Sequence, residues 1–379
     1  MALCYGLDHV RDETNEDQQE QQQQYSYAVE LALSPVLPFV LKAVVELQVL
    51  DIIAKAGPGA QLSPTQIASQ LPPAGPTALV GNPEAPEMLD RMLRLLASHS
   101  ILTCSVVDHD SPAPALDGRL YGLAPVAKYF VPNQDGASLA PILILALEKA
   151  FVGSWYQLKG AVLEGGIPFH RVHGIPAFEY STNDPRFSEV FNKAMIDHSA
   201  IVNKKILESS YKGFEQVQKL VDVGGGLGAT LKLITSKYPH ITAVNFDLPH
   251  VIQHAPPYPR VEHVGGDMFG IIPKGDAILM KWILHNWSDD HCLKLLKNCY
   301  KALPENGKVI VVDGILPVMP DSSAATKGIF QMDLQMMAQL FGGKERTQQE
   351  FSALATGAGF SGIRLECLVC DLWIMEFYK

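Results

Sequence analysis

Apolar and polar positions follow different patterns in the two halves of the chain. Up to about residue 215, apolar residues recur mainly at helical spacing, and Pro35 and Pro38 interrupt the pattern. Beyond residue 215, short apolar runs alternate with segments of helical spacing. Such alternation is typical of a parallel sheet covered by helices on both faces. The pattern therefore predicts an α/β fold preceded by a mainly helical part.

The N-terminal pattern predicts helices followed by a β-hairpin. Prolines should divide the first helical stretch into two or three helices, and Ser63 with Pro64 should begin the next. Helices are predicted over 25–56, 62–71 and 87–102, and strands over 101–108 and 119–124. This is the pattern of a winged helix, which could serve either DNA binding or dimerisation.

The C-terminal pattern predicts a mostly parallel sheet. Parallel strands are predicted at 219–223, 241–247, 261–267, 276–282 and 308–314, and helices near 227–237, 289–303 and 347–358. Two final runs, 362–369 and 371–379, follow one another too closely for a crossover helix. We therefore expect them to pair antiparallel at one edge of the sheet.

Length and charge narrow the possible partners. A chain of 379 residues is long for a single core, so we expect two domains. The formal net charge of −10 argues against a nucleic-acid partner, because phosphate binding needs a basic surface. The same acidity favours dimerisation over DNA binding for the winged-helix pattern.

Sequence features of membrane and secreted proteins are missing. The longest apolar run, 139–147, is too short to cross a bilayer and predicts a buried helix. The first residues lack the basic and apolar regions of a signal peptide. Six scattered cysteines form no disulfide pattern, and the single CxxC of Cys367 and Cys370 has no second pair to hold a metal. We therefore expect a cytoplasmic protein with no membrane partner and no metal.

A glycine-rich loop follows the first strand of the predicted sheet. The segment 220-LVDVGGGLGATLKLI-234 places four glycines between a strand and a helix, where a ligand can approach the backbone. Taken alone, this pattern also fits a nicotinamide-dependent oxidoreductase, or a turn that only packs a helix on a strand.

Acidic residues around the loop indicate which ligand it would bind. Asp247 ends the second strand, where a carboxylate can accept both hydroxyls of a ribose. Asp267 ends the third strand beside Met268, which offers an apolar face to a flat base. Asp222, directly before the glycines, would repel a pyrophosphate but attract an ammonium or a sulfonium. These residues favour S-adenosylmethionine over a nicotinamide dinucleotide.

Polar residues interrupt the fourth strand at its carboxyl end. In 280-MKWILHNWSDDHC-292, Lys281, Trp282 and His285 follow an apolar run. Open α/β folds bind ligands at this edge of the sheet. Ser288 can cap the helix that comes next.

Six ordered segments between Tyr25 and Lys379 carry a family resemblance: LVDVGGGLGA, NFDLPHVI, VEHVGGDMF, MKWILHNWSDDHCLKLLKNCYKALPENGKVIVVD, ILPVMPDSSAATKG and GGKERTQQEF. They resemble the plant caffeic acid O-methyltransferase family of S-adenosylmethionine-dependent phenol methyltransferases. The resemblance implies a homodimer formed through an N-terminal winged-helix domain, followed by a Rossmann-like methyltransferase domain. With the acidic, Gln-rich segment 11–24 expected to be disordered, we place a tail at 1–24, the dimerisation domain at 25–170 and the methyltransferase domain at 171–379.

The resemblance also implies three sets of site residues. The methyl donor would contact Gly224, Asp247, Leu248, Asp267, Met268 and Lys281. The phenolic acceptor would contact Ala146, Phe151, Phe187, Phe191, Met195, His198, Met336 and Leu340. The catalytic set would be His285 with two acidic partners, Asp313 and Glu345, and no metal.

His285 is the expected general base. A phenol has a pKa of about 10, and a neutral imidazole can take its proton as the methyl group transfers. The imidazole needs an acidic residue that holds one tautomer. Asp313 stands where the family usually has glutamate and is one methylene shorter. We therefore expect Glu345 to carry more of this task.

The acceptor pocket departs from the family at two positions. Ala146 and Leu340 stand where relatives that methylate lignin precursors typically have asparagine. Losing polar partners predicts a broad or altered acceptor range. Caffeic acid, 5-hydroxyferulic acid, their aldehydes or esters, stilbenes and flavonoids all stay possible, as do three other functions: a nicotinamide-dependent oxidoreductase, a winged-helix regulator without catalysis and a metal-dependent methyltransferase.

Overall fold

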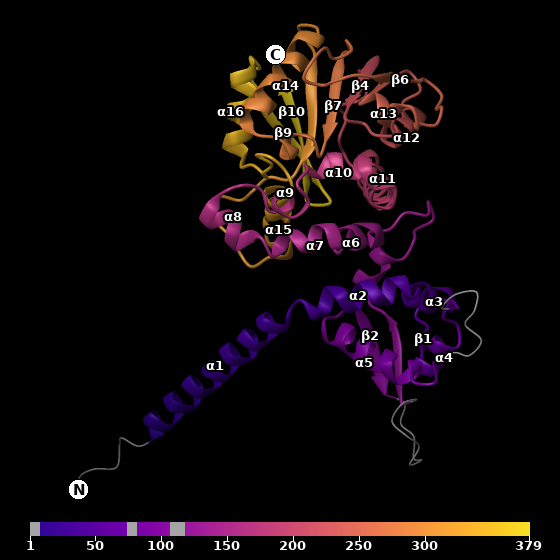
Figure 1. The fold of residues 1–379 in the computed structure, drawn as a ribbon, viewed down its shortest axis with the longest axis vertical. Coiled ribbons are helices and arrows are strands. Elements are labelled where there is room, and N and C mark those ends of the chain that lie inside the picture. Colours follow the sequence, from indigo (N-terminus) through magenta and orange to yellow (C-terminus); the bar gives the residue numbers. More distant parts are fainter. Residues whose placement is uncertain (1–7, 74–81, 107–117) are drawn as a thin grey trace. The chain divides into compact units, whose positions relative to one another are not determined.

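The computed structural model describes residues 8–73, 82–106 and 118–379 (Figure 1). It divides into two compact units, Met1–Gly136 and Ala137–Lys379. This boundary lies before the predicted one at residue 170. The difference arises because the helices after Gly136 pack on helices of the second unit: α6 (Ala140–Ala146) contacts α11 (Pro185–Glu208), and α7 (Lys149–Trp155) contacts α15 (Ala324–Gln339).

In the first unit, only one of the two prolines predicted to interrupt the first helices does so. The helices of this unit are α1 (Asp8–Leu33), α2 (Val36–Glu46), α3 (Val49–Lys55), α4 (Pro64–Ala68) and α5 (Ala85–Ser98). Pro35 separates α1 from α2 as predicted. Pro38 lies in the first turn of α2, where a missing N–H breaks no helical hydrogen bond.

Helix α1 covers much of the segment predicted to be a disordered tail. Residues 8–24 are helical, and every side chain from residue 17 to residue 33 is exposed. Glu and Gln are good helix formers, so local propensity favours a helix even where no apolar face is buried.

A three-stranded sheet completes the first unit. β2 (Leu102–Val106) and β3 (Arg119–Leu123) pair antiparallel, as predicted, and β1 (Gln61–Leu62) pairs with the other edge of β3. Ser63 caps α4 through a capping box with Gln66. The 3₁₀ helix η1 (Pro125–Phe130) follows the sheet. Most of the turn-rich segment between β2 and β3 lies outside the described residues.

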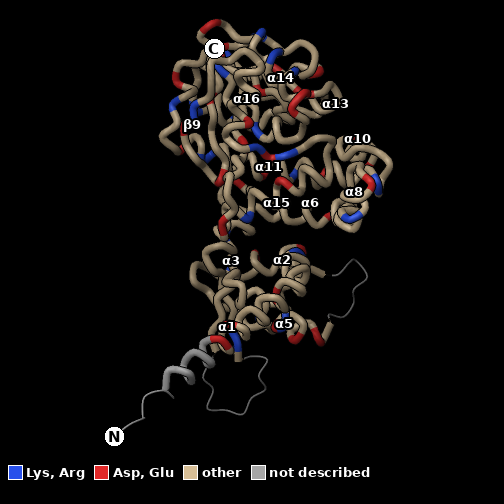
Figure 2. The backbone as a smooth tube through the Cα atoms, turned by 90° about the vertical axis from the view of Figure 1, so that its left-hand side faces the viewer, with Lys and Arg blue, Asp and Glu red and all other residues tan. Residues whose placement is uncertain are grey.

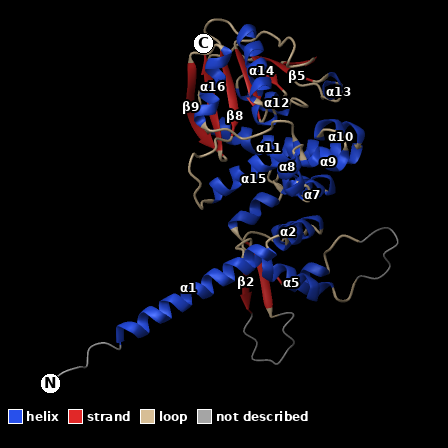
Figure 3. Cartoon of the chain, turned by 60° about the vertical axis from the view of Figure 1, so that its left-hand side comes forward, coloured by secondary structure: helices blue, strands red, loops and turns tan. Residues whose placement is uncertain are grey.

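The second unit contains a seven-stranded sheet in the order β6-β5-β4-β7-β8-β10-β9. Figure 3 draws its strands in red. The strands are β4 (Lys219–Val223), β5 (Thr242–Asp247), β6 (Val261–Gly265), β7 (Ala277–Lys281), β8 (Lys308–Asp313), β9 (Gly362–Val369) and β10 (Leu372–Tyr378). β4 to β8 pair in parallel, and β10 pairs antiparallel with both β8 and β9 at one edge of the sheet. Both features confirm the prediction.

Helices cover both faces of this sheet because its strands alternate between two apolar cores. On β4, Val221 and Val223 face a core shared with α14 (Asp289–Ala302) and α16 (Gln348–Ala358). Leu220 faces a core shared with α11 and α12 (Ala229–Lys237). Burial on both sides explains the continuous apolar runs in the sequence.

Shorter helices connect these elements. They are α8 (Leu158–Glu164), α9 (Pro168–His173), α10 (Ala177–Asn183), α13 (Pro249–Ile252) and the 3₁₀ helix η2 (Leu284–Asn286). Along the second unit, acidic and basic positions are interspersed (Figure 2).

Among the described residues, no single helix is long and apolar enough to cross a bilayer. Asp17–Leu33 and Val36–Glu46, bent by 51°, reach that length and composition only as a pair.

Candidate active site

The predicted base is buried against one acidic side chain. His285 lies in η2, just beyond β7, and is 4% exposed. Its Nδ1 lies 2.7 Å from Oε1 of Glu345, which is also buried. A carboxylate can only accept here, so Nδ1 carries the hydrogen and Nε2 is left as a proton acceptor. Burial lowers the pKa of His285, but the hydrogen bond and charge of Glu345, with the charge of Asp313, outweigh burial and raise it.

The second predicted partner of the base makes a different contact. Asp313 ends β8 and is fully buried, and its Oδ1 accepts a hydrogen bond from the backbone N–H of Trp282 at 2.8 Å. Burial raises the pKa of Asp313 to about 7. The hydrogen bond to His285 comes from Glu345. The two acidic residues therefore lie near the same base but bond to different groups.

A buried arginine that the sequence pattern did not single out holds the loop that carries His285. Arg346 is fully buried, and its guanidinium donates to the carbonyls of Leu284 at 2.8 Å and Trp287 at 2.7 Å. Its Nε and Nη2 also both donate to Oδ1 of Asp289, at 2.9 and 2.8 Å. These bonds fix the chain on both sides of His285. The charged run KER looks like a solvated surface, so only the structure identifies this role.

The glycine loop is held by the neighbouring strand β5. The N–H of Gly226 donates to Oδ2 of Asp247 at 2.8 Å, and its carbonyl accepts from Nδ2 of Asn245 at 2.9 Å. The other oxygen of Asp247 accepts from the N–H of Leu248 at 2.7 Å. Each carboxylate oxygen keeps a further lone pair, so Asp247 can still accept two ligand hydroxyls.

Buried acceptors beside the loop have no donor. Oδ2 of Asp222 and Oδ1 of Asn245 are buried without a hydrogen-bond partner in the described part of the chain. Burial, with the charge of Asp247, raises the pKa of Asp222 to about 7, against the opposing charge of Lys281. A ligand with a cationic, hydrogen-donating group would relieve this arrangement.

Three residues connect the predicted donor side with the predicted acceptor pocket. Lys281, predicted at the donor, has its Nζ 3.4 Å from Nδ1 of His198, which is predicted in the acceptor pocket. Both contact Trp282: the His198 ring stacks on the indole at 3.8 Å, and Nζ of Lys281 lies 4.2 Å from its centroid. Burial lowers the pKa of Lys281 to about 8, and burial with the charge of Lys281 places the pKa of His198 well below its usual value. His198 is therefore neutral, with Nδ1 as the acceptor.

The remaining residues predicted at the donor lie along the same edge of the sheet. The N–H of Gly224 donates to the carbonyl of Phe246 at 2.8 Å, and Oδ1 of Asp267 accepts from the N–H of Phe269 at 2.9 Å. Met268 packs against the core, whereas Leu248 is 45% exposed.

Most residues predicted for the acceptor pocket form one apolar cluster. Phe151, Phe187, Met336 and Leu340 are buried in it, and Phe191 and Met195 pack against it. The rings of Phe151 and Phe187 meet edge to face at 5.2 Å. Ala146, at the end of α6, lies outside the cluster and is partly exposed.

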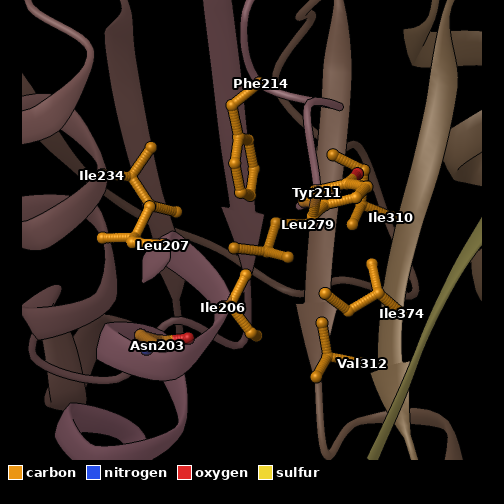
Figure 4. Close-up of a pocket in the computed structure, with 10 residues that line it drawn as sticks. All are labelled: Asn203, Ile206, Leu207, Tyr211, Phe214, Ile234, Leu279, Ile310, Val312 and Ile374. Carbon is orange, nitrogen blue, oxygen red and sulfur yellow. The ribbon is translucent and has the colours of Figure 1, made fainter. Parts of the chain in front are cut away.

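A separate small cavity shares none of the predicted site residues. It lies on the α11 and α12 side of the sheet and is lined mainly by apolar side chains, among them Ile206, Tyr211 and Leu279 (Figure 4). Within the described ranges, no group of three or more His, Cys, Asp or Glu side chains could hold a metal ion.

Comparison with known proteins assigns the family. Residues 155–361 match the O-methyltransferase domain, and residues 29–133 match the O-methyltransferase dimerisation domain. A caffeic acid 3-O-methyltransferase of Prunus dulcis is 59% identical over 353 residues, covering 93% of this chain and 94% of the relative. The chain belongs to the O-methyltransferase family. A catechol O-methyltransferase of Solanum lycopersicum is 57% identical over 363 residues, covering 93% of this chain and 95% of that protein.

Solved structures confirm the fold of this O-methyltransferase. Human N-acetylserotonin methyltransferase, solved in complex with S-adenosylmethionine, matches with a TM-score of 0.76 at 21% identity, covering 94% of this chain and 98% of the other. The predicted Rossmann-like methyltransferase domain with an N-terminal dimerisation domain is therefore confirmed. Membership of this family decides against the nicotinamide-dependent oxidoreductase and the non-catalytic regulator.

Proposed function

We propose that this O-methyltransferase transfers the methyl group of S-adenosylmethionine to a phenolic hydroxyl of a plant phenylpropanoid, with His285 as the general base. The observation that carries the proposal is the buried hydrogen bond of 2.7 Å between His285 and Glu345. It leaves Nε2 of the imidazole to receive the phenol's proton and lets Glu345 stabilise the imidazolium that results.

The residues along the carboxyl edge fit this donor. Asp247 can accept the ribose hydroxyls, and Met268 with Asp267 can take the adenine. The unpartnered oxygens of Asp222 and Asn245 suit a cationic amino-acid tail. When bound, the donor supplies a methyl group on a positively charged sulfur. Gly224, Leu248 and Lys281 complete the proposed contacts.

The acceptor is proposed to be caffeic acid, 5-hydroxyferulic acid or one of their aldehydes or esters, with a broad range. Leu340 is 8% exposed within an apolar cluster, so it offers no hydrogen bond to a second ring substituent. Stilbenes and flavonoids are the alternative acceptors. A panel of these phenols incubated with labelled donor would rank them, and strict selectivity for one would contradict the proposed range.

A homodimer, a cytoplasmic location and independence of metal ions complete the proposal. The match of residues 29–133 to a dimerisation domain supports the dimer, which light scattering would test. Undiminished turnover with a chelator is expected, whereas loss that Mg²⁺ restores would favour a metal-dependent enzyme.

The variant His285→Ala tests the base. We expect turnover of caffeic acid to fall about 10³-fold, because a positioned base contributes this much. Binding of S-adenosylhomocysteine, measured by calorimetry, should stay within about threefold of wild type, since His285 lies outside the proposed donor contacts. Turnover like that of wild type would remove His285 as the base.

A further inference from the structure

Asp313 contacts the backbone of a tryptophan rather than the base beside it. Its Oδ1 accepts from the N–H of Trp282 at 2.8 Å, while the imidazole of His285 is bonded to Glu345. Oδ2 of Asp313 is buried without a partner in the described ranges. Within the described ranges, the hydrogen bond of the Asp313 carboxylate therefore goes to the turn after β7.

That turn has an unusual backbone conformation. Trp282 has a φ of +56°, a left-handed conformation that bulky residues rarely adopt. Its N–H also approaches the carbonyl of Val312 at 3.2 Å, and its carbonyl accepts from Nδ2 of Asn286 at 2.8 Å. Such a conformation persists only where surrounding contacts hold it. Asp313 supplies the shorter of the two contacts to the N–H.

The indole of Trp282 lies next to both histidines of the site. It stacks on His198 with ring centroids 3.8 Å apart and planes 13° apart, and lies 5.9 Å and 27° from His285. A shift of this turn would move the indole and change the spacing of the two imidazoles. His198 belongs to the proposed acceptor pocket, and His285 is the proposed base.

We propose that Asp313 is a positioning residue that acts through Trp282, setting the geometry in which the phenolic acceptor binds, and is not a second hydrogen-bonding partner of His285. The inference rests on the proposed function. It assigns the two acidic residues separate tasks: Glu345 orients the base, and Asp313 fixes the turn against which the acceptor pocket is built.

The test compares Asp313→Ala, Asp313→Asn and Glu345→Gln in the full-length protein. Asp313→Ala removes the closer of the two acceptors for the Trp282 N–H, whereas Asp313→Asn keeps an oxygen in nearly the same place. We expect Asp313→Ala to raise KM for caffeic acid about tenfold, with a smaller fall in kcat. Asp313→Asn should restore much of the affinity. Glu345→Gln should instead lower kcat at least about 100-fold.

Two controls keep the outcomes separate. Thermal unfolding identifies a variant that fails to fold, and the isosteric Asp313→Asn then carries the test. Binding of caffeic acid in the presence of S-adenosylhomocysteine, followed by calorimetry, reports the pocket without any chemistry. Equal affinities for Asp313→Ala and Asp313→Asn, or a kcat loss in Asp313→Asn as large as in Glu345→Gln, would overturn the inference. Wild-type turnover in Glu345→Gln would instead contradict the proposed function. The calorimetric affinities for caffeic acid would still test the role of Asp313.

Discussion

At the carboxyl edge of the sheet, the predicted donor side and the side of the predicted base are built from different kinds of contact. On the donor side, main-chain groups of the glycine loop bond to side chains of the adjacent strand, as between Gly226 and Asp247, 21 residues apart. On the base side, buried charged side chains connect segments far apart, as between His285 and Glu345, separated by 60 residues. The donor side therefore depends on close backbone packing, and the base side on charge and hydrogen-bond geometry.

After His285→Ala, the largest effect is expected from removing the charge beside the proposed base. Glu345→Gln keeps the shape of the side chain, but a neutral amide stabilises the imidazolium poorly, so kcat should fall about 10²- to 10³-fold. Glu345 raises the pKa of His285, and as the proposed base His285 works only when neutral. Activity should therefore rise with pH through that pKa, and in the variant the rise should move to lower pH. A pH profile of kcat/KM for caffeic acid checks this; an unmoved profile would contradict it.

The next effect concerns Arg346, which holds the loop that carries His285. Arg346→Met removes the donors to Leu284 and Trp287, so the free energy of unfolding should fall by about 3 kcal/mol and kcat about 30-fold. Arg364→Met is the matched control, because Arg364 on β9 is 63% exposed. Urea unfolding and steady-state kinetics measure both variants. Equal behaviour of the two would show that Arg346 does not position the base.

On the donor side, a single methyl group should be sufficient to disturb binding. A Cβ on Gly225 would lie 2.2 Å from Oδ1 of Asn245 and 2.8 Å from Oδ2 of Asp222. Gly225→Ala should therefore weaken binding of S-adenosylhomocysteine about tenfold, since the loop must shift. Gly328→Ala serves as the control, because a Cβ there meets nothing within 4 Å. Unchanged affinity in Gly225→Ala would show that the glycine loop accommodates the added methyl group without disturbing donor binding, which would contradict this prediction.

The smallest effect is a pH dependence of donor binding. Burial raises the pKa of Asp222 to about 7, so the carboxylate is mostly neutral below that pH and charged above it. A charged Asp222 attracts a cationic donor, so affinity for S-adenosylmethionine should rise severalfold from about pH 6 to pH 8. Calorimetric titrations check this, and Asp222→Asn should remove the dependence. An equally steep dependence in that variant would assign it to another group.

The same residue should also affect stability in the absence of ligand. A folded-state pKa raised above its ordinary value means that the native chain binds more protons than the unfolded chain between about pH 4 and 7. The contribution of Asp222 to the free energy of unfolding therefore decreases as the pH rises through this window.

The difference between the two sides also decides what the sequence can predict. Strand periodicity and the glycine run place the sheet and the loop correctly, because both are local patterns. The pairing of His285 with Glu345 was expected only from the family resemblance, since no local pattern connects residues 60 apart. Arg346 and the left-handed Trp282 were missed altogether: a buried arginine has the same local sequence signature as a solvated one.

The contact of Lys281 with His198 shows a further limit of local patterns. The family motif assigns the two residues to different ligands, yet their side chains meet at 3.4 Å. Likewise, the helical spacing of Phe187 and Phe191 predicts a shared face but not its neighbours, which come from α7 and α15. Long-range packing supplies this information.

Arg346 holds the loop of the base mainly through carbonyl oxygens, which every amino acid possesses. The side chains of Leu284 and Trp287 take no part in these hydrogen bonds and are left to pack in the apolar core on one face of the sheet. One arginine thus allows the same short loop both to fill that core and to keep the imidazole of His285 at a fixed place.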